Sequence, residues 1–195
     1  MEKDAILSRL SFLKAAGHLK DTLRSAYTPG GSPESSAEHS WRLVLWLMVF
    51  GDQLPDQVDR LKLMKMAVLH DLGEAITGDT PAPLQRPDQN KHSEERAAWE
   101  QLLAPLPAAM RDEFLALWLE YEAAQSLEAK LVKGFDKLET MVTHNQGANP
   151  ADFDYAWNLG YGVKHTQDGG LLQAIRALVD EETRAHAVGR GQPVF

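Results

Sequence analysis

The chain of 195 residues contains no cysteine. Disulfide bonds, thiolate metal ligands and cysteine nucleophiles are therefore excluded. Long apolar runs are also missing, since the most apolar stretch, residues 43–50, is much shorter than the roughly 20 residues that a membrane-spanning helix requires. The first residues carry no basic segment followed by an apolar core, so we expect no signal peptide. Together these absences favour a soluble, cytoplasmic protein that does not enter a membrane.

Positive charge is scarce. The chain has 20 Lys and Arg against 28 Asp and Glu, which gives a formal net charge of −8. Such a broad negative field repels polyanions, so neither nucleic acid nor an anionic membrane surface is expected as a partner. A small phosphate ester is not excluded, because it needs only a local cluster of a metal ion and an arginine. The length suits one domain with a sizeable core.

The dominant pattern in the sequence is helical. Strand signals are weak throughout, whereas apolar residues recur with the 3.6-residue spacing of a helix, so we predict an all-α fold. Apart from the two helices discussed next, the predicted helices cover residues 4–20, 91–103 and 107–122, a long segment capped by Ser126, a short segment at Trp157, and residues 171–187.

Two further helices bring histidines toward the core. Residues 35–38 form a capping box, with Ser at the N-cap and Glu at N3, which predicts a helix to about residue 50 with His39 in its first turn. The next helix, with Asp56 as its candidate cap, carries His70 and the aspartate that follows it. This helix is expected to end near Gly78, since glycine adopts the left-handed conformation common at helix ends.

Three apolar helices thus place ionisable residues where core residues are expected, namely His39, His70 with Asp71, and Asp136. Taken singly, a buried histidine is more often a hydrogen-bonded core residue than a metal ligand. A buried aspartate more often caps a helix or forms an ion pair. Two imidazoles and two carboxylates on separate helices are instead a mixed nitrogen and oxygen set that suits Mn, Fe, Co, Ni or Zn rather than Ca.

One geometric condition applies to this set. Neighbouring residues on a helix point about 100° apart, so His70 and Asp71 share an ion only if it lies between their two directions. Glu74 is better aligned with both, because it follows His70 by four residues and Asp71 by three.

Five segments in order carry a resemblance to a known family: Leu-Arg-Ser-Ala-Tyr at 23–27, Ala-Glu-His-Ser-Trp at 37–41, Met-Ala-Val-Leu-His-Asp-Leu-Gly-Glu-Ala-Ile-Thr-Gly-Asp at 66–79, Lys-His-Ser-Glu-Glu at 91–95 and Phe-Asp-Lys-Leu-Glu at 135–139. Over about residues 13–183 the chain resembles the HD-domain metal-dependent phosphohydrolases, and within them the 5′-deoxynucleotidase-type branch. The resemblance implies one compact HD-domain bundle over residues 1–195, with a core of about 20–145, flanking helices at both ends, and a homodimer.

The resemblance also implies roles for individual residues. The four that match the family's metal ligands are His39, His70, Asp71 and Asp136, and they would hold one divalent transition-metal ion, with magnesium as an alternative. Arg24 matches an arginine that contacts the substrate phosphate. Glu74 and Asp79 match carboxylates beside the attacking water and the phosphate, and which of them acts as base or acid is left open.

Other interpretations remain for some of these residues. Glu74 could instead orient a ligand histidine, and Asp79 could be a turn residue after Gly78. His144 could approach the site but is not assigned to it. In one position the chain departs from the family pattern, because Arg24 is followed by Ser25 where such deoxynucleotidases can carry a tryptophan near the sugar. The base and sugar preferences therefore stay open.

The predicted activity is release of phosphate from nucleoside or deoxynucleoside 5′-monophosphates by a metal-activated water. One alternative is an HD-type hydrolase of another phosphate ester, such as a nucleoside triphosphate or a cyclic dinucleotide. The other is a non-catalytic module that binds nucleotides. In each case the expected partner is a small phosphate-bearing molecule.

Overall fold

The computed structural model describes residues 2–84, 91–167 and 169–194. The all-α prediction is confirmed, since helices dominate the described residues and the sheet they contain has two short strands. In chain order the longer helices are α1 Lys3–Ala16, α2 Ser36–Val49, α3 Arg60–Leu69, α5 Lys91–Leu103, α6 Ala108–Ala123, α7 Leu127–Gln146 and α10 Gly170–Gly189. The shorter ones are η1 Gly17–Lys20, η2 Gly51–Gln53, α4 Glu74–Thr77, η3 Ala82–Leu84, α8 Tyr155–Asn158 and α9 Val163–Thr166.

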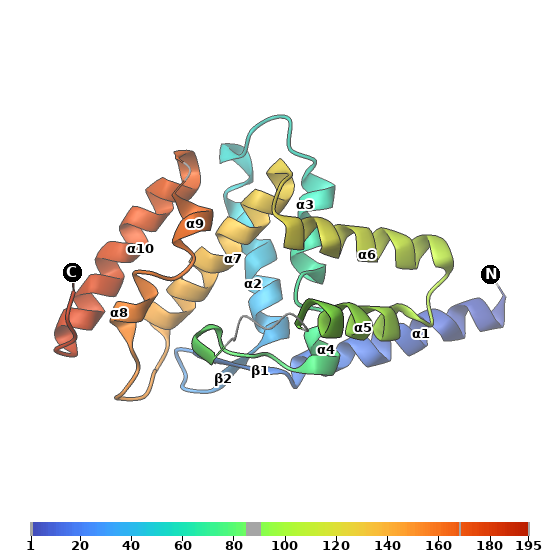
Figure 1. The fold of residues 1–195 in the computed structure, drawn as a ribbon, viewed down its shortest axis with the longest axis horizontal. Coiled ribbons are helices and arrows are strands. Elements are labelled where there is room, and N and C mark those ends of the chain that lie inside the picture. Colours follow the sequence, from blue (N-terminus) through green and yellow to red (C-terminus); the bar gives the residue numbers. More distant parts are fainter. Residues whose placement is uncertain (1, 85–90, 168, 195) are drawn as a thin grey trace.

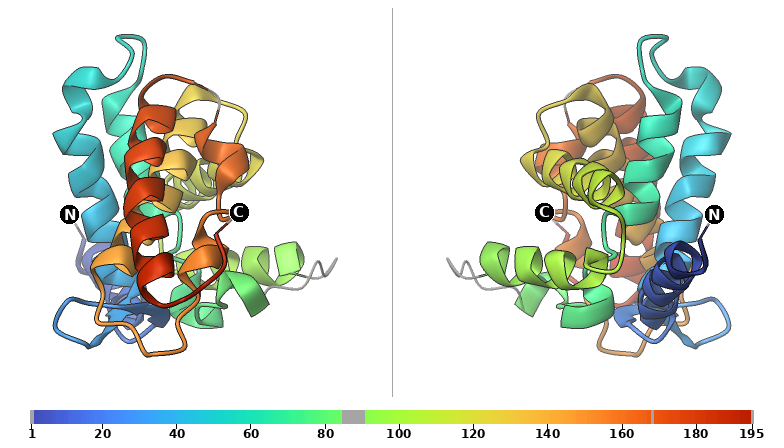
Figure 2. Two further views of the ribbon diagram at one scale, coloured as in Figure 1. Left: turned by 90° about the vertical axis from the view of Figure 1, so that its left-hand side faces the viewer. Right: turned by 90° about the vertical axis from the view of Figure 1, so that its right-hand side faces the viewer.

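Helix α7 is the central element of the fold. It contacts α2, α3, α6 and α10, and it lies between α10 and the α2–α3 pair (Figures 1 and 2). Its inward side is apolar and fully buried at Phe135, Leu138 and Met141. The apolar residues recur at helical spacing, so one face of α7 packs against the core along its whole length. An ionisable residue on that face, such as Asp136, is thereby held inside the protein.

Several predicted helix starts agree with the structure. Ser35 and its capping box begin α2, and the Ser126 side chain caps α7. The predicted cap of α3 is wrong, because Asp59 rather than Asp56 accepts a hydrogen bond from the backbone of the first turn. Pro107 stands at the N-cap of α6 and not at N1 as expected, a shift of one residue.

The helix that carries the His-Asp pair is shorter than predicted. One helix was expected to reach Gly78, whereas α3 ends at Leu69 and α4 begins only at Glu74. Backbone bonds of 2.9 and 3.0 Å between residues three apart, across 69–72 and 71–74, tighten the chain into a turn. The geometric condition is nevertheless met, because the side chains turn toward each other and place Asp71 Oδ2 3.0 Å from His70 Nε2.

A small hairpin is the other correction to the all-helical prediction. Strand β1 Leu23–Tyr27 pairs antiparallel with β2 Pro33–Ser35, and Gly31 turns the chain back with a φ of 85°. The strand Leu-Arg-Ser-Ala-Tyr contains no valine, isoleucine or threonine, so its sequence carried little strand signal. The hairpin matters for function because it holds Arg24 against α7.

We expect Gly73→Ala to destabilise the protein by about 1–3 kcal/mol, the usual range for overpacking a core. A Cβ atom at this position would lie 2.9 Å from two ring atoms of Trp99, and that ring is fully buried against Trp118. Urea unfolding provides the measurement. Gly17→Ala is the matched control, since a Cβ atom there meets nothing within 4 Å and the φ of Gly17 is −60°. Equal losses in both variants would contradict the packing explanation.

Candidate active site

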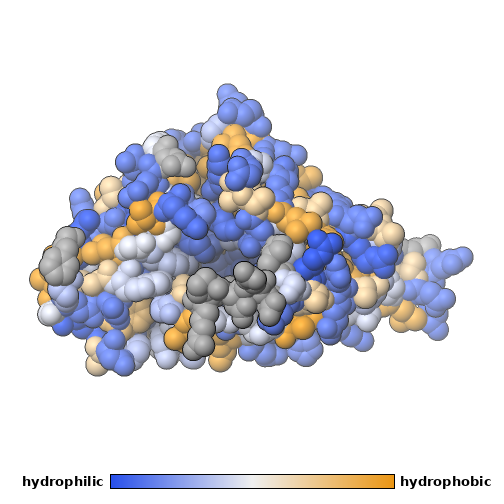
Figure 3. Space-filling model, in the orientation of Figure 1, coloured by the Kyte–Doolittle hydropathy of each residue, from blue (hydrophilic) through white to orange (hydrophobic). Residues whose placement is uncertain are grey.

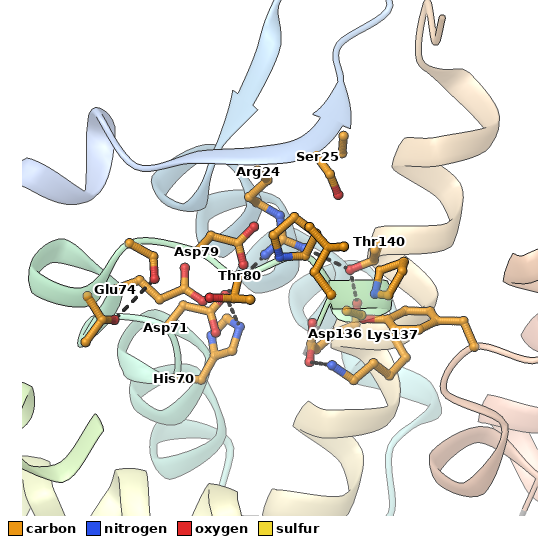
Figure 4. A pocket seen from close by; sticks show the side chains of 18 of the residues that line it. Arg24, Ser25, His70, Asp71, Glu74, Asp79, Thr80, Asp136, Lys137 and Thr140 are labelled. Carbon is orange, nitrogen blue, oxygen red and sulfur yellow. Dashed lines mark hydrogen bonds and ion pairs between the residues drawn. The ribbon is translucent and has the colours of Figure 1, made fainter. Parts of the chain in front are cut away.

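A cavity of about 1020 Å³ opens beside α7 and contains most of the predicted site residues. Seen from the side of Figure 1, the surface is hollowed near its middle, and the residues visible inside the recess are mainly hydrophilic (Figure 3). Arg24 reaches the cavity from β1, His70 and Asp71 from the turn after α3, and Asp136 from α7 (Figure 4). His39, in the first turn of α2, is fully buried and contacts Asp136 without lining the cavity itself.

The four predicted metal ligands come together. Ligand atoms of His39, His70 and Asp136, all three buried, lie within 4.8 Å of one another and form a group that could hold a metal ion. His39 Nε2 is 3.2 Å from Asp136 Oδ1. Asp71 stands beside the group, with its Oδ2 atom 3.0 Å from His70 Nε2 and 3.7 Å from His39 Nε2. Ligands about 2 Å from one ion have comparable separations of about 3 Å.

The histidine tautomers test whether a metal ion fits this group. His70 Nδ1 donates to the carbonyl oxygen of Ala67 at 2.9 Å, and His39 Nδ1 donates to the carboxylate of Glu139. Since Nδ1 carries the proton in both rings, each Nε2 presents a lone pair to the group. Both Nε2 atoms are buried and have no hydrogen-bond partner among the described residues. Buried unpaired acceptors of this kind are suited to a metal ion.

The charges around His39 also indicate that a metal ion fits this group. Burial and the nearby Arg24 lower the pKa of His39, but Glu139 and Asp136 outweigh them and raise it to about 10. The surrounding carboxylates therefore favour a positive charge at this point. A divalent ion would supply that charge in place of a proton, because metal ligands bind in their deprotonated form.

Asp136 is oriented by two residues that the sequence analysis did not assign. The Tyr121 hydroxyl donates to Asp136 Oδ2 at 2.7 Å, and Lys137 Nζ lies 2.9 Å from the same oxygen. Oδ1 is left facing His39. Burial would raise the pKa of Asp136, but Lys137 and His39 hold it well below its usual range, so the carboxylate is charged.

We expect Tyr121→Phe to weaken divalent metal binding about tenfold, as is typical when a partner that orients a ligand is lost. The phenyl ring keeps its place against His70, and only the hydrogen bond to Asp136 is removed. Titration with Mn²⁺ measures the affinity. Tyr155→Phe serves as control, because it removes a buried hydroxyl whose partner is Asn149, outside the metal group. A loss of the same size in both variants would argue against an orienting role.

Arg24, which the sequence predicts to bind the substrate phosphate, lies next to the metal group. Its guanidinium is 3.4 Å from Asp71 Oδ2, 3.4 Å from Glu34 Oε2, and donates to the Thr140 hydroxyl at 3.1 Å. Glu34 and Thr140 were not identified from the sequence. Since three partners hold the guanidinium, it meets a substrate in a fixed position and needs little reorganisation.

A second cluster able to hold a metal ion consists of Glu34, His39 and Glu139. In this structure arginines already neutralise its carboxylates, because Arg24 pairs with Glu34 and Arg42 Nε lies 2.9 Å from Glu139 Oε1. Of the two clusters, the group of His39, His70 and Asp136 is the better candidate for a metal ion, because it contains both unpaired Nε2 atoms. Glu139 instead fixes the His39 tautomer. The signals in the sequence were its position three residues after Asp136 and its place in the segment 135–139 that carries the family resemblance.

Glu74 and Asp79 both line the cavity, on the opposite side of Asp71 from Lys137 and Thr140 (Figure 4). The Ser36 hydroxyl donates to Glu74 Oε2 at 2.6 Å. Burial and the neighbouring charge of Asp71 raise the pKa of Glu74 to about 8. Since other groups hold the Nδ1 atoms of both histidines, Glu74 is not required to orient them.

His144 lines the cavity but stays outside the metal group. Its Nδ1 atom donates to the Asn158 side chain at 3.1 Å, and burial lowers its pKa to about 4. In the segment 91–95, Glu94 and Glu95 line the cavity, whereas the side chains of Lys91 and His92 lie outside the described residues.

A mainly helical fold with a His-Asp turn facing an aspartate on a central helix defines a class of metal-binding proteins, and comparison with known proteins identifies it. Residues 16–176 match the family model described as HD domain. The chain belongs to the HD domain family.

Relatives of known name are similar over most of the chain. The human protein 5′-deoxynucleotidase HDDC2 is 35% identical over 137 residues, which are 69% of this chain and 66% of that protein. The chain thus spans slightly less than two thirds of this relative's length. The Xenopus laevis protein of the same name is 33% identical over 187 residues, 92% of this chain and 90% of that one.

Solved structures support the fold. A conserved hypothetical protein from Pyrococcus furiosus is 30% identical with a TM-score of 0.66, over 90% of this chain and 99% of that one. A predicted metal-dependent phosphohydrolase from Magnetospirillum magnetotacticum has a TM-score of 0.80 at 24% identity, over 98% and 100% of the two chains, which shows the fold alone. No helix among the described residues is long and apolar enough to span a membrane.

Proposed function

We propose that the protein is a metal-dependent phosphohydrolase that releases phosphate from nucleoside 5′-monophosphates, deoxy forms included. The observation that carries this proposal is a buried group of His39, His70 and Asp136 with two unpaired imidazole nitrogens, which lies at the wall of a cavity that a positioned guanidinium also lines. The similarity to proteins named 5′-deoxynucleotidase supports the substrate class.

The proposed ligands of one divalent ion are His39, His70, Asp71 and Asp136. When bound, such an ion lowers the pKa of a water molecule toward neutrality and polarises a phosphoryl oxygen. The mixed nitrogen and oxygen donors favour Mn, Co, Fe, Ni or Zn, with Mg as the alternative.

Arg24 is the proposed phosphate-binding residue. Its planar guanidinium forms paired hydrogen bonds to two phosphate oxygens and offsets the charge that develops on them during the reaction. Burial opposes a charged guanidinium, but Asp71 and the neighbouring acids raise the pKa of Arg24 above its ordinary value. Arg24 is therefore charged at every pH at which the protein is folded.

Glu74 and Asp79 are the proposed proton-transfer residues. One accepts a proton from the attacking water and the other returns a proton to the leaving 5′-oxygen. A group is most effective in this work when its pKa lies near the working pH. Glu74, with its pKa raised to about 8 by burial and Asp71, meets this condition.

A phosphate-release panel tests the proposal. The purified protein is incubated with ribo- and deoxynucleoside 5′-monophosphates in the presence of Mn²⁺, Co²⁺ or Mg²⁺. Turnover of the monophosphates is expected, with little release from nucleoside triphosphates or cyclic dinucleotides. Turnover of those esters alone would favour a different HD-type hydrolase, and binding without any turnover would favour a non-catalytic nucleotide-binding module.

A single domain over residues 1–195, a cytoplasmic location and a homodimer stay predictions, the first two from the sequence and the dimer from the family resemblance. Sedimentation of the purified protein tests the dimer directly.

A further inference from the structure

We infer that Trp157 and Tyr161 form the surface on which the base of the nucleotide stacks. The inference rests on the proposed function and names how the same site would recognise the nucleoside part of its substrate. Both residues line the cavity that contains the metal group, and they come from α8 and the turn that follows it.

Lys137 connects this aromatic pair to the metal group. Its Nζ atom is 2.9 Å from Asp136 Oδ2 and 5.3 Å from the centre of the Tyr161 ring. The ammonium group of Lys137 therefore lies between the Tyr161 ring and Asp136, a proposed metal ligand. A nucleoside 5′-monophosphate has a similar layout, with a phosphate at one end, a sugar between, and a flat base at the other end.

The two rings of this platform pack on each other, and Trp157 is the one exposed to solvent. Their centres are 5.1 Å apart and their planes are inclined by 30°, and the Trp157 side chain is 36% exposed. Other tryptophans at this cavity do not offer an open face, since Trp99 and Trp118 are 1% and 3% exposed and stack on each other in the core. An accessible indole at the rim of a cavity provides the flat apolar surface on which any base can stack.

The backbone beneath the platform is held firmly. Arg176, which is buried on α10, donates to the carbonyl oxygens of Asn158, Leu159 and Tyr161 at 3.2, 2.7 and 2.6 Å. The Asp154 side chain caps the other end of the segment by accepting from the backbone N–H of Trp157 at 3.0 Å. A surface fixed in this way loses little conformational freedom when a ligand binds, which favours affinity.

Acidic residues elsewhere in the cavity lining are unsuited to a base. They include Asp79, Glu94 and Glu95, and in Figure 4 the acidic Glu74 lies across Asp71 from Lys137. The platform is thus on the Lys137 side of the reaction centre. Because stacking depends on the flat face that every base shares, we also expect similar kcat/KM values for purine and pyrimidine nucleotides.

The experiment compares two substrates in the full-length protein loaded with Mn²⁺, a deoxynucleoside 5′-monophosphate and 2-deoxyribose 5-phosphate, which is the same ester without a base. Trp157→Ala should raise KM for the nucleotide about tenfold, in line with the loss of one stacking contact, with kcat nearly unchanged. The loss with 2-deoxyribose 5-phosphate should be several times smaller. Trp157→Phe, which keeps an aromatic face, should recover most of the nucleotide KM.

Trp41→Ala is the matched control, since Trp41 is 66% exposed on α2 and does not line the cavity, and it should behave as the wild type. If Trp157→Ala raised KM equally for both substrates, or did not raise KM for the nucleotide, the platform would be wrong. The proposed nucleotide hydrolysis would not be affected by that result. Equal kcat/KM of the wild type for both substrates would overturn the platform in the same way. If the wild type hydrolyses neither ester, the proposed function itself fails and the platform fails with it.

Discussion

His70→Ala is expected to empty the metal site and to lower phosphate release by about 1,000-fold or more. The expected size follows from the several kcal/mol of transition-state stabilisation that a bound divalent ion supplies. His70 provides one of the two unpaired Nε2 atoms, and its loss leaves His39, Asp71 and Asp136 to bind the ion without it. Metal analysis of the purified variant should find far less than the roughly one ion per chain expected for the wild type.

The matched control for this variant is His144→Ala. His144 is also a buried histidine that lines the cavity, but its ring is held by Asn158 and it is not part of the metal group. It should keep its metal ion. If His70→Ala bound metal as well as the wild type, the ligand assignment would be wrong. If it lost the ion but kept its activity, the ion would have no part in the reaction.

Metal removal should also be visible in stability. An ion that binds the folded state alone raises the melting temperature by mass action. A chelator should therefore lower the melting temperature of the wild type and of His144→Ala, and should have little further effect on His70→Ala. If a chelator lowered the melting temperature of His70→Ala as much as that of the wild type, the ion would bind at a different site.

Helix starts were the part of the fold that could be predicted best from the sequence. Ser35 and Ser126 cap α2 and α7 through hydrogen bonds that span only three residues, so the whole signal lies in the local sequence. The end of α3 could not be predicted in this way. Gly73, in the turn after α3, packs closely against the Trp99 ring of α5, and a tertiary contact of this kind leaves no signal in the local sequence.

The same distinction applies to the site. His39, His70 and Asp136 could be proposed as a set because each interrupts an apolar helical pattern, and the structure brings all three into one group. Tyr121 and Thr140 could not, since each is an ordinary helix residue that meets Asp136 or Arg24 only through the packing of α6, α7 and β1. Partners that orient a ligand are thus identified by the tertiary structure and not by spacing in the sequence.

Arg24→Ala is expected to lower kcat/KM for nucleoside 5′-monophosphates by about 100-fold or more while the metal ion stays bound. The expected size is that of a lost charged donor to the reacting group. Retention of the metal ion is the part of the prediction that best distinguishes phosphate binding from a role in the metal site. The Arg24 guanidinium lies 3.4 Å from Asp71 Oδ2, so its removal takes a positive charge away from a proposed ligand and leaves that carboxylate freer to bind a cation.

Two further variants separate charge from geometry at this position. Arg24→Lys keeps the positive charge but cannot form paired hydrogen bonds with a phosphate, so it should recover only part of the lost activity. Arg96→Ala removes an exposed arginine that pairs with Glu100 on the same helix, and it should behave as the wild type. Activity, metal content and melting temperature are measured together. Loss of the metal ion from Arg24→Ala would assign Arg24 to assembly of the metal site, because phosphate binding alone does not require the ion to leave with the guanidinium.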